Sequence, residues 1–211
     1  RENHSELLWW FEGFTSYYDD LILRRAGLIT DEVYLQLVAK HHNQVLQTPG
    51  RHLQSVAQAS FDAWTKYYRM GENTPNATVS YYTKGALVAL CLDLSLRADG
   101  HTTLDAVMRE LWQRCEGGPM RESDLLRALK KLGRRSFEGE LQAWVHSTAE
   151  LPLDKLLQAL TGWDKVRAGL TILGVAVGVF VVVVISAAVH GINTSVAKAQ
   201  PCTTRINRMS E

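Results

Sequence analysis

The chain has 211 residues, of which 46% are hydrophobic and 21% are charged, and its formal net charge is +1. This composition is ordinary for a globular protein and suffices for one domain of about 150 residues with an appendage. Because no block of lysine or arginine stands out, we expect no nucleic-acid partner. The three cysteines, Cys91, Cys115 and Cys202, are widely spaced and odd in number, which suggests neither a metal site nor a disulfide framework.

Residues 5 to about 160 carry the period of amphipathic helices. Apolar residues recur three and four positions apart, the spacing of one helix face, over residues 86–94, 104–112, 125–132 and 137–145. No segment alternates apolar and polar residues between turn signals, so strands are at most minor. We therefore predict an all-α, helical domain over residues 1–160.

Short polar segments are predicted to delimit these helices. Thr30 before "DEV" and Ser123 before "DLL" have the side chains and the positions of helix N-caps. Turns that contain proline or glycine separate helices at residues 48–50, 72–76 and 115–119.

Several side chains are predicted to serve packing rather than chemistry. Cys91 falls on an apolar helix face and should be a small buried residue. Packing is also the prediction for Tyr17 and Tyr18, whereas Asp19 and Asp20 should be exposed or paired acids. Five tryptophans should anchor the core because of their large apolar area: Trp9, Trp10, Trp64, Trp112 and Trp144.

The character of the chain changes after Pro152. Residues 161–168 are a predicted linker, and residues 169–189 carry no charge over a length that could cross a bilayer as a transmembrane helix. The run is also rich in valine, so a buried strand or an out-of-frame translation are alternatives. Residues 190–211 form a polar tail, and positive residues on both sides of the run leave its orientation open. Membrane association through residues 169–189 is the only localisation that the sequence suggests.

Two segments carry the chemistry. "WWFEGFTSYYDD", residues 9–20, places Glu12 among aromatic side chains, where a carboxylate is costly to bury unless it is paired or binds a metal ion. Seventy residues after Glu12, Tyr82 opens the sequence Tyr-Thr-Lys-Gly on a predicted helix. A phenol is neutral at pH 7 and can donate a hydrogen bond to an oxygen atom on which negative charge develops.

Together the two segments resemble the gluzincin metallopeptidases, and specifically the M61 (glycyl aminopeptidase-like) family. The resemblance implies the helical C-terminal lobe of a thermolysin-like catalytic domain. It also implies that Glu12 is the third ligand of a catalytic Zn²⁺ and that Tyr82 stabilises the oxyanion of the tetrahedral intermediate. Residues 48–69 and 144–153 look like M61 segments as well, so the resemblance covers residues 1 to about 160.

The chain departs from the family at one decisive motif. No HExxH, the source of two histidine ligands and of the general-base glutamate, occurs in the 211 residues. In the family this motif precedes the glutamate ligand, so it would lie before Arg1, and Arg1 is not a start methionine. We expect that the chain is a piece of a longer protein and that it is inactive and binds Zn²⁺ weakly when alone.

Two functions follow from these observations. The first is a fragment of a zinc-dependent aminopeptidase that hydrolyses N-terminal peptide bonds, with a peptide as the substrate of the complete protein. The alternative is a membrane-anchored, non-catalytic helical interaction module. The sequence leaves the substrate specificity and the oligomeric state open.

Overall fold

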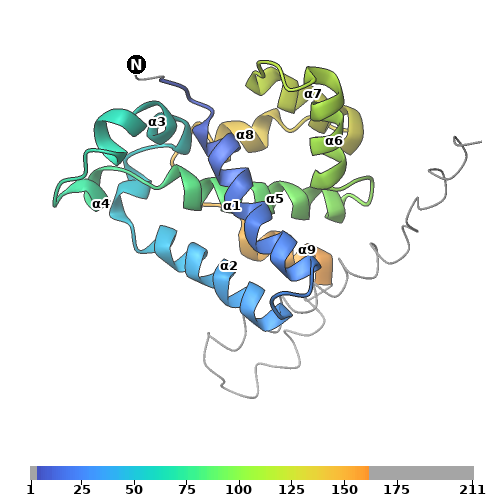
Figure 1. Cartoon of the computed structure of the whole chain (residues 1–211), viewed down its shortest axis with the longest axis horizontal. Helices are drawn as coiled ribbons and strands as arrows, with labels where there is room; N and C mark the ends of the chain where they lie inside the picture. Colours follow the sequence, from blue (N-terminus) through green and yellow to red (C-terminus); the bar gives the residue numbers. More distant parts are fainter. Residues whose placement is uncertain (1–3, 162–211) are drawn as a thin grey trace, which may run out of the picture.

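The computed structural model describes residues 4–161, and every regular element in this part of the chain is helical (Figure 1). The predicted all-α fold is therefore confirmed for these residues. The elements are α1 (Leu8–Arg25), α2 (Asp31–Leu46), η1 (Pro49–His52), α3 (Val56–Phe61), η2 (Ala63–Tyr67), α4 (Thr74–Ala77), α5 (Tyr81–Ala98), α6 (Leu104–Cys115), α7 (Glu122–Gly133), α8 (Glu138–Trp144) and α9 (Leu153–Thr161).

The C-terminal predictions fall outside this part of the chain. The predicted linker, apart from Thr161, the candidate membrane helix at 169–189 and the tail at 190–211 all lie beyond the described residues. Among the helices that are described, none combines the length and the apolar character that a membrane span requires.

Helices α1 and α5 cross in the middle of the fold, in contact through their backbones (Figure 1). A Cβ atom added at Gly13 would lie 2.5 Å from the Cα atom of Gly85, and one added at Gly85 would lie 2.4 Å from the carbonyl oxygen of Trp9. Both distances are too short for any side chain, so the crossing requires glycine on both helices. This contact fixes how the two helices are placed relative to each other.

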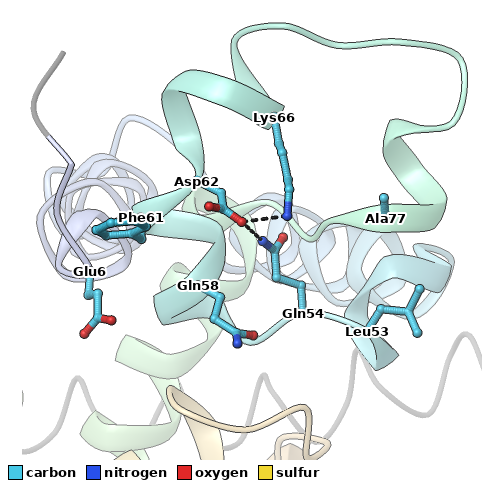
Figure 2. Close-up of a pocket in the computed structure, with 8 residues that line it drawn as sticks. All are labelled: Glu6, Leu53, Gln54, Gln58, Phe61, Asp62, Lys66 and Ala77. Carbon is cyan, nitrogen blue, oxygen red and sulfur yellow. Dashed lines mark hydrogen bonds and ion pairs between the residues drawn. The ribbon is translucent and has the colours of Figure 1, made fainter.

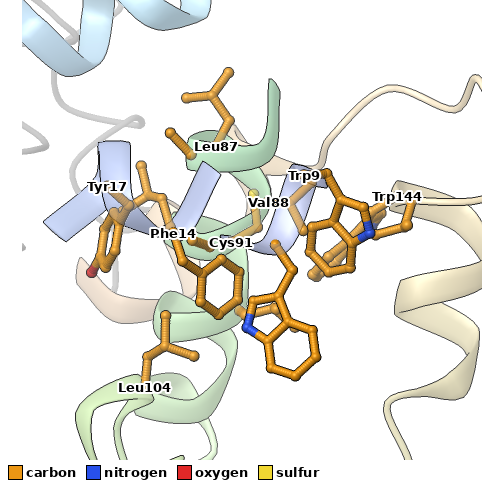
Figure 3. Packing of buried hydrophobic residues seen from close by; sticks show 14 of the residues in the cluster. Trp9, Phe14, Tyr17, Leu87, Val88, Cys91, Leu104 and Trp144 are labelled. Carbon is orange, nitrogen blue, oxygen red and sulfur yellow. The ribbon is translucent and has the colours of Figure 1, made fainter. Parts of the chain in front are cut away.

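Helix α5 is buried on nearly all sides, because the other helices surround it. It begins at Ser80, whose hydroxyl accepts a hydrogen bond from the backbone N–H of Thr83 at 3.2 Å. Figure 3 shows the core that forms around it, with side chains from α1, α5, α6 and α8 packed together. Cys91 lies in this core and is fully buried, as predicted.

One buried carboxylate ties three helices together. Asp93 of α5 accepts hydrogen bonds from the Tyr17 hydroxyl of α1 at 2.9 Å and from the backbone N–H of Leu104 at the start of α6 at 2.8 Å. The guanidinium of Arg97 donates to it as well, at 2.8 Å. A buried charge is tolerated when its oxygens are satisfied in this way, so Asp93 helps to set the position of α1.

The two predicted N-caps have different outcomes. The Thr30 hydroxyl accepts a hydrogen bond from the backbone N–H of Val33 at 3.3 Å, which confirms this cap. The prediction for Ser123 is wrong, because α7 begins one residue earlier, at Glu122. The carboxylate of Asp124 accepts from the backbone N–H of Arg121 at 2.8 Å, and this bond closes the first turn in place of a serine cap.

The tryptophans divide into buried and exposed residues. Trp9, Trp10 and Trp144 are buried in the core, as predicted. The prediction is wrong for Trp64 and Trp112, whose exposed fractions are 38% and 70%. Trp112 lies about 80° around the axis of α6 from the buried Leu104, so it falls beyond the face that the rest of the domain covers. Trp64 lies on η2, at the surface.

Candidate active site

The crossing of α1 and α5 brings the two chemical motifs together. Glu12 directly precedes Gly13, and Tyr82 lies in the first turn of α5, three residues before Gly85. The pKa of Tyr82 is raised to about 12, chiefly by a hydrogen bond with Tyr68 and by partial burial. The negative charge of Glu12 raises this pKa further, so the carboxylate acts electrostatically on the phenol.

The Glu12 carboxylate, on α1, is not occupied by a partner from the described part of the chain. The residue is half-buried, and no hydrogen bond or ion pair to its side chain is found among residues 4–161. By contrast, the Asp93 carboxylate has its oxygens occupied by three donors. A half-buried carboxylate without a partner is suited to accept a cation or a hydrogen-bond donor.

The described residues fit one ligand position of a metal site and not a complete site. Within residues 4–161 there is no group of three or more His, Cys, Asp or Glu side chains that could hold a metal ion. Three histidines face carboxylates instead: His41 lies 4.0 Å from Asp20, His52 lies 3.8 Å from Glu150, and His146 lies 2.9 Å from Glu122.

Three tyrosine hydroxyls meet near the start of α5. The Tyr81 hydroxyl donates to the Tyr68 hydroxyl at 3.2 Å, and the Tyr68 and Tyr82 hydroxyls are 3.3 Å apart, with either able to donate. The rings of Tyr81 and Tyr82 have centroids 4.7 Å apart. Sequence patterns do not single out Tyr68, because only the folded chain brings its hydroxyl to the Tyr-Thr-Lys-Gly motif.

Lys84 of the same motif points into the interior. It is buried, and this burial lowers the pKa of its ammonium group; the nearby charges of Glu150 and Arg51 act on it in opposite directions. Glu150 and Arg51 pair with each other at 3.0 Å. No hydrogen bond or ion pair to the Lys84 ammonium is found in the described part of the chain.

The other polar residues of the first motif serve packing. The Tyr17 hydroxyl donates to Asp93, and the Tyr18 hydroxyl donates to Asp105 at 3.0 Å, which agrees with the packing prediction. Asp19 is exposed and Asp20 is half-buried near His41, as predicted for exposed or paired acids.

A separate hollow lies next to η2 (Figure 2). Its volume is about 340 Å³, and it is lined by Glu6, Leu53, Gln54, Gln58, Phe61, Asp62, Lys66 and Ala77. The Asp62 carboxylate accepts from the Gln54 amide at 2.8 Å and from the Lys66 ammonium at 2.6 Å. Neither Glu12 nor Tyr82 lines this hollow, so we assign it no catalytic role.

Comparisons with known proteins point to one family. Residues 1–88, which include both Glu12 and Tyr82, match the family model of the M61 glycyl aminopeptidases. This segment is therefore similar to the M61 peptidase family. A crystal structure of an aminopeptidase N family protein from Idiomarina loihiensis is similar to it, with 38% sequence identity and a TM-score of 0.72. No curated protein matches the chain.

These matches cover only part of the relative, which limits what they establish for this chain. The similarity to the Idiomarina loihiensis structure covers 76% of this chain but only 28% of that one. The chain therefore corresponds to about a quarter of the length of its structural relative. The matches show similarity to a peptidase family, whereas the activity of the complete protein is a matter for proposal.

Proposed function

We propose that this chain is part of a zinc-dependent aminopeptidase in which Glu12 is a metal ligand and Tyr82 stabilises the oxyanion. The observation that carries the proposal is the Glu12 carboxylate, which has no hydrogen bond or ion pair among residues 4–161 and whose charge acts on the phenol of Tyr82, inside the segment that matches the M61 family. The Gly13–Gly85 contact supports it, because it holds the two helices at one fixed separation.

Glu12 would provide one of the protein ligands of the zinc ion. A catalytic zinc site uses three protein ligands and keeps one position open. The other two ligands would be the histidines of an HExxH segment, which the described residues do not contain. Bound zinc would supply a Lewis acid that activates water for attack on the peptide bond.

Tyr82 would act as a neutral hydrogen-bond donor. Because its pKa is about 12, the phenol keeps its proton throughout the neutral pH range. It can therefore donate to the carbonyl oxygen of the substrate as negative charge develops on that oxygen. Donors of this kind typically contribute about 10²–10³-fold to kcat.

The substrate class follows from the family. The matched family is named for glycyl aminopeptidases, so we propose a peptide whose N-terminal residue is glycine or another small residue. Residues that recognise the substrate amine are not assigned among those described. In this proposal the chain alone does not hydrolyse peptides, since it supplies one ligand and one oxyanion donor.

The test is Glu12→Gln in the complete peptidase that contains this chain. The expected result is loss of bound zinc, measured by atomic absorption, and loss of hydrolysis of glycyl-p-nitroanilide. Asp19→Asn is the matched control, since Asp19 is an exposed acid on the same helix. An E12Q enzyme that retains one equivalent of zinc and full activity would refute the assignment. For the chain alone, calorimetry with Zn²⁺ should give only weak binding, and a nanomolar site would count against the proposal.

A further inference from the structure

We propose that Tyr68 is a positioning residue for Tyr82, holding the phenol in place through the contact between their hydroxyls. The hydroxyl contact is independent of the proposed function. The catalytic consequence rests on that function, since it assumes that Tyr82 donates to the substrate.

The three hydroxyls form a short chain with Tyr68 in the middle. Tyr81 donates its only O–H to Tyr68, so the proton of Tyr68 itself remains available for Tyr82. At 3.3 Å either hydroxyl of the second pair can donate. When Tyr82 turns its proton toward a developing oxyanion, Tyr68 can donate to Tyr82 in its place. All three bonds then point the same way, an arrangement in which each bond strengthens the next.

A π-helical turn places Tyr68 at this position. The backbone N–H of Tyr68 donates to the carbonyl oxygen of Ala63 at 2.9 Å, five residues earlier, which is the hydrogen bond of a π-helix. Such turns are rare and are frequently found at functional sites. The extra residue in the turn changes the direction of Tyr68, whose ring contacts that of Trp64 with centroids 5.2 Å apart.

The turn is itself held by polar contacts at its start. Asp62 receives hydrogen bonds from Gln54 and Lys66, as Figure 2 shows. Gln54 is buried and comes from the segment before α3, so the turn is anchored to the body of the domain. Tyr68 has an exposed fraction of 55%, yet its hydroxyl faces two other hydroxyls.

The groups that act on Tyr82 come from three elements. Tyr68 follows η2, Tyr81 is its neighbour on α5, and Glu12 lies on α1; the ring of Tyr67, on η2, packs 6.0 Å away. The bond with Tyr68 is the largest cause of the raised pKa of Tyr82. Its removal should therefore change the pKa of Tyr82.

The test compares Tyr68→Phe with Tyr67→Phe. Y68F removes one oxygen atom and keeps the ring, whereas Y67F removes a neighbouring hydroxyl for which no hydrogen bond is found among residues 4–161. In this chain, NMR of ¹³C-labelled tyrosine, with Tyr82→Phe to assign the signal, should show a changed pKa for Tyr82 in Y68F only. An unchanged Tyr82 pKa in a Y68F chain with normal thermal unfolding would overturn the proposal.

The catalytic part needs the complete peptidase. There Y68F should lower kcat about tenfold, with KM unchanged, and should shift the alkaline limb of the pH profile; Y67F should do neither. If Y68F changes the Tyr82 pKa but leaves kcat and the pH profile unchanged, the positioning of the phenol stands and the catalytic role proposed for Tyr82 fails. If neither the pKa nor kcat changes, the positioning role itself is wrong.

Discussion

The two sides of the candidate site are built in different ways. Glu12 and Tyr82 sit on α1 and α5, whose backbones touch at Gly13 and Gly85 and whose apolar faces are buried. Tyr68 follows a five-residue π-helical turn that carries exposed aromatic rings and is anchored through Asp62. The first side is held by close packing and the second by a few polar contacts.

This difference indicates which part of the site can adjust. Close-packed helices resist small displacements, because any shift creates overlaps or cavities. A surface turn held by hydrogen bonds opens locally at low cost. We therefore expect the Glu12 carboxylate and the Tyr82 phenol to keep their places while the Tyr68 side adapts. Three variants test this contrast.

The largest effect is expected at the crossing. Gly85→Val would place a branched side chain where even a Cβ atom lies 2.4 Å from the carbonyl oxygen of Trp9. The helices must separate, so we expect the free energy of unfolding to fall by roughly 4–5 kcal/mol, measured by urea denaturation. Gly139→Ala is the control: no atom lies within 4 Å of its added Cβ, and stability should rise by about 0.4–1 kcal/mol. Equal changes in the free energy of unfolding for the two variants would show that the crossing does not stabilise the fold.

An intermediate effect is expected from Lys84→Met, because it removes a buried ammonium group. Burial lowers the pKa of Lys84 in the folded state below its value of about 10.4 in the unfolded chain. The charged form therefore destabilises the wild type at neutral pH, and this penalty disappears as the pH rises toward the unfolded-state value. The stability of K84M relative to wild type should accordingly decrease between pH 7 and pH 10 in urea unfolding. A pH-independent difference would mean that the burial of this charge carries no cost.

The smallest effect on global stability is expected from Lys66→Met, in the turn. Its ion pair with Asp62 is largely exposed, so the free energy of unfolding should change by less than about 1 kcal/mol. Locally, hydrogen exchange at the backbone N–H of Tyr68 should become faster, since the turn loses one anchor. Unchanged exchange at Tyr68 would show that the turn does not depend on this contact.

The sequence was sufficient to predict those parts of the fold that depend on local patterns. The helical period identified the class, Thr30 marked a true helix start, and Cys91 lies where its helix face indicates. The prediction that Ser123 is an N-cap failed because Asp124 supplies a competing acceptor for the same turn. The prediction that Trp112 is buried failed because periodicity shows which face of a helix is apolar and not how far the neighbouring helices extend over it.

The candidate site can likewise be predicted from the sequence only in part. Glu12 and Tyr82 stand in short motifs that resemble a known family, so the amino-acid sequence alone is enough to select them. Their proximity and the part played by Tyr68 depend on contacts between residues that are distant in sequence. No local pattern encodes the meeting of three hydroxyls or the direction that a π-helical turn gives to one of them.

The paired glycines have a consequence for evolution. A larger residue on one helix cannot be accommodated by a change on the same helix, because the obstacle is the main chain of the other. Substitutions at positions 13 and 85 are thus constrained jointly, and divergent homologues that preserve this geometry must conserve a minimal side chain at both. That pairwise rule offers a filter for recognising remote members when the rest of the sequence has drifted.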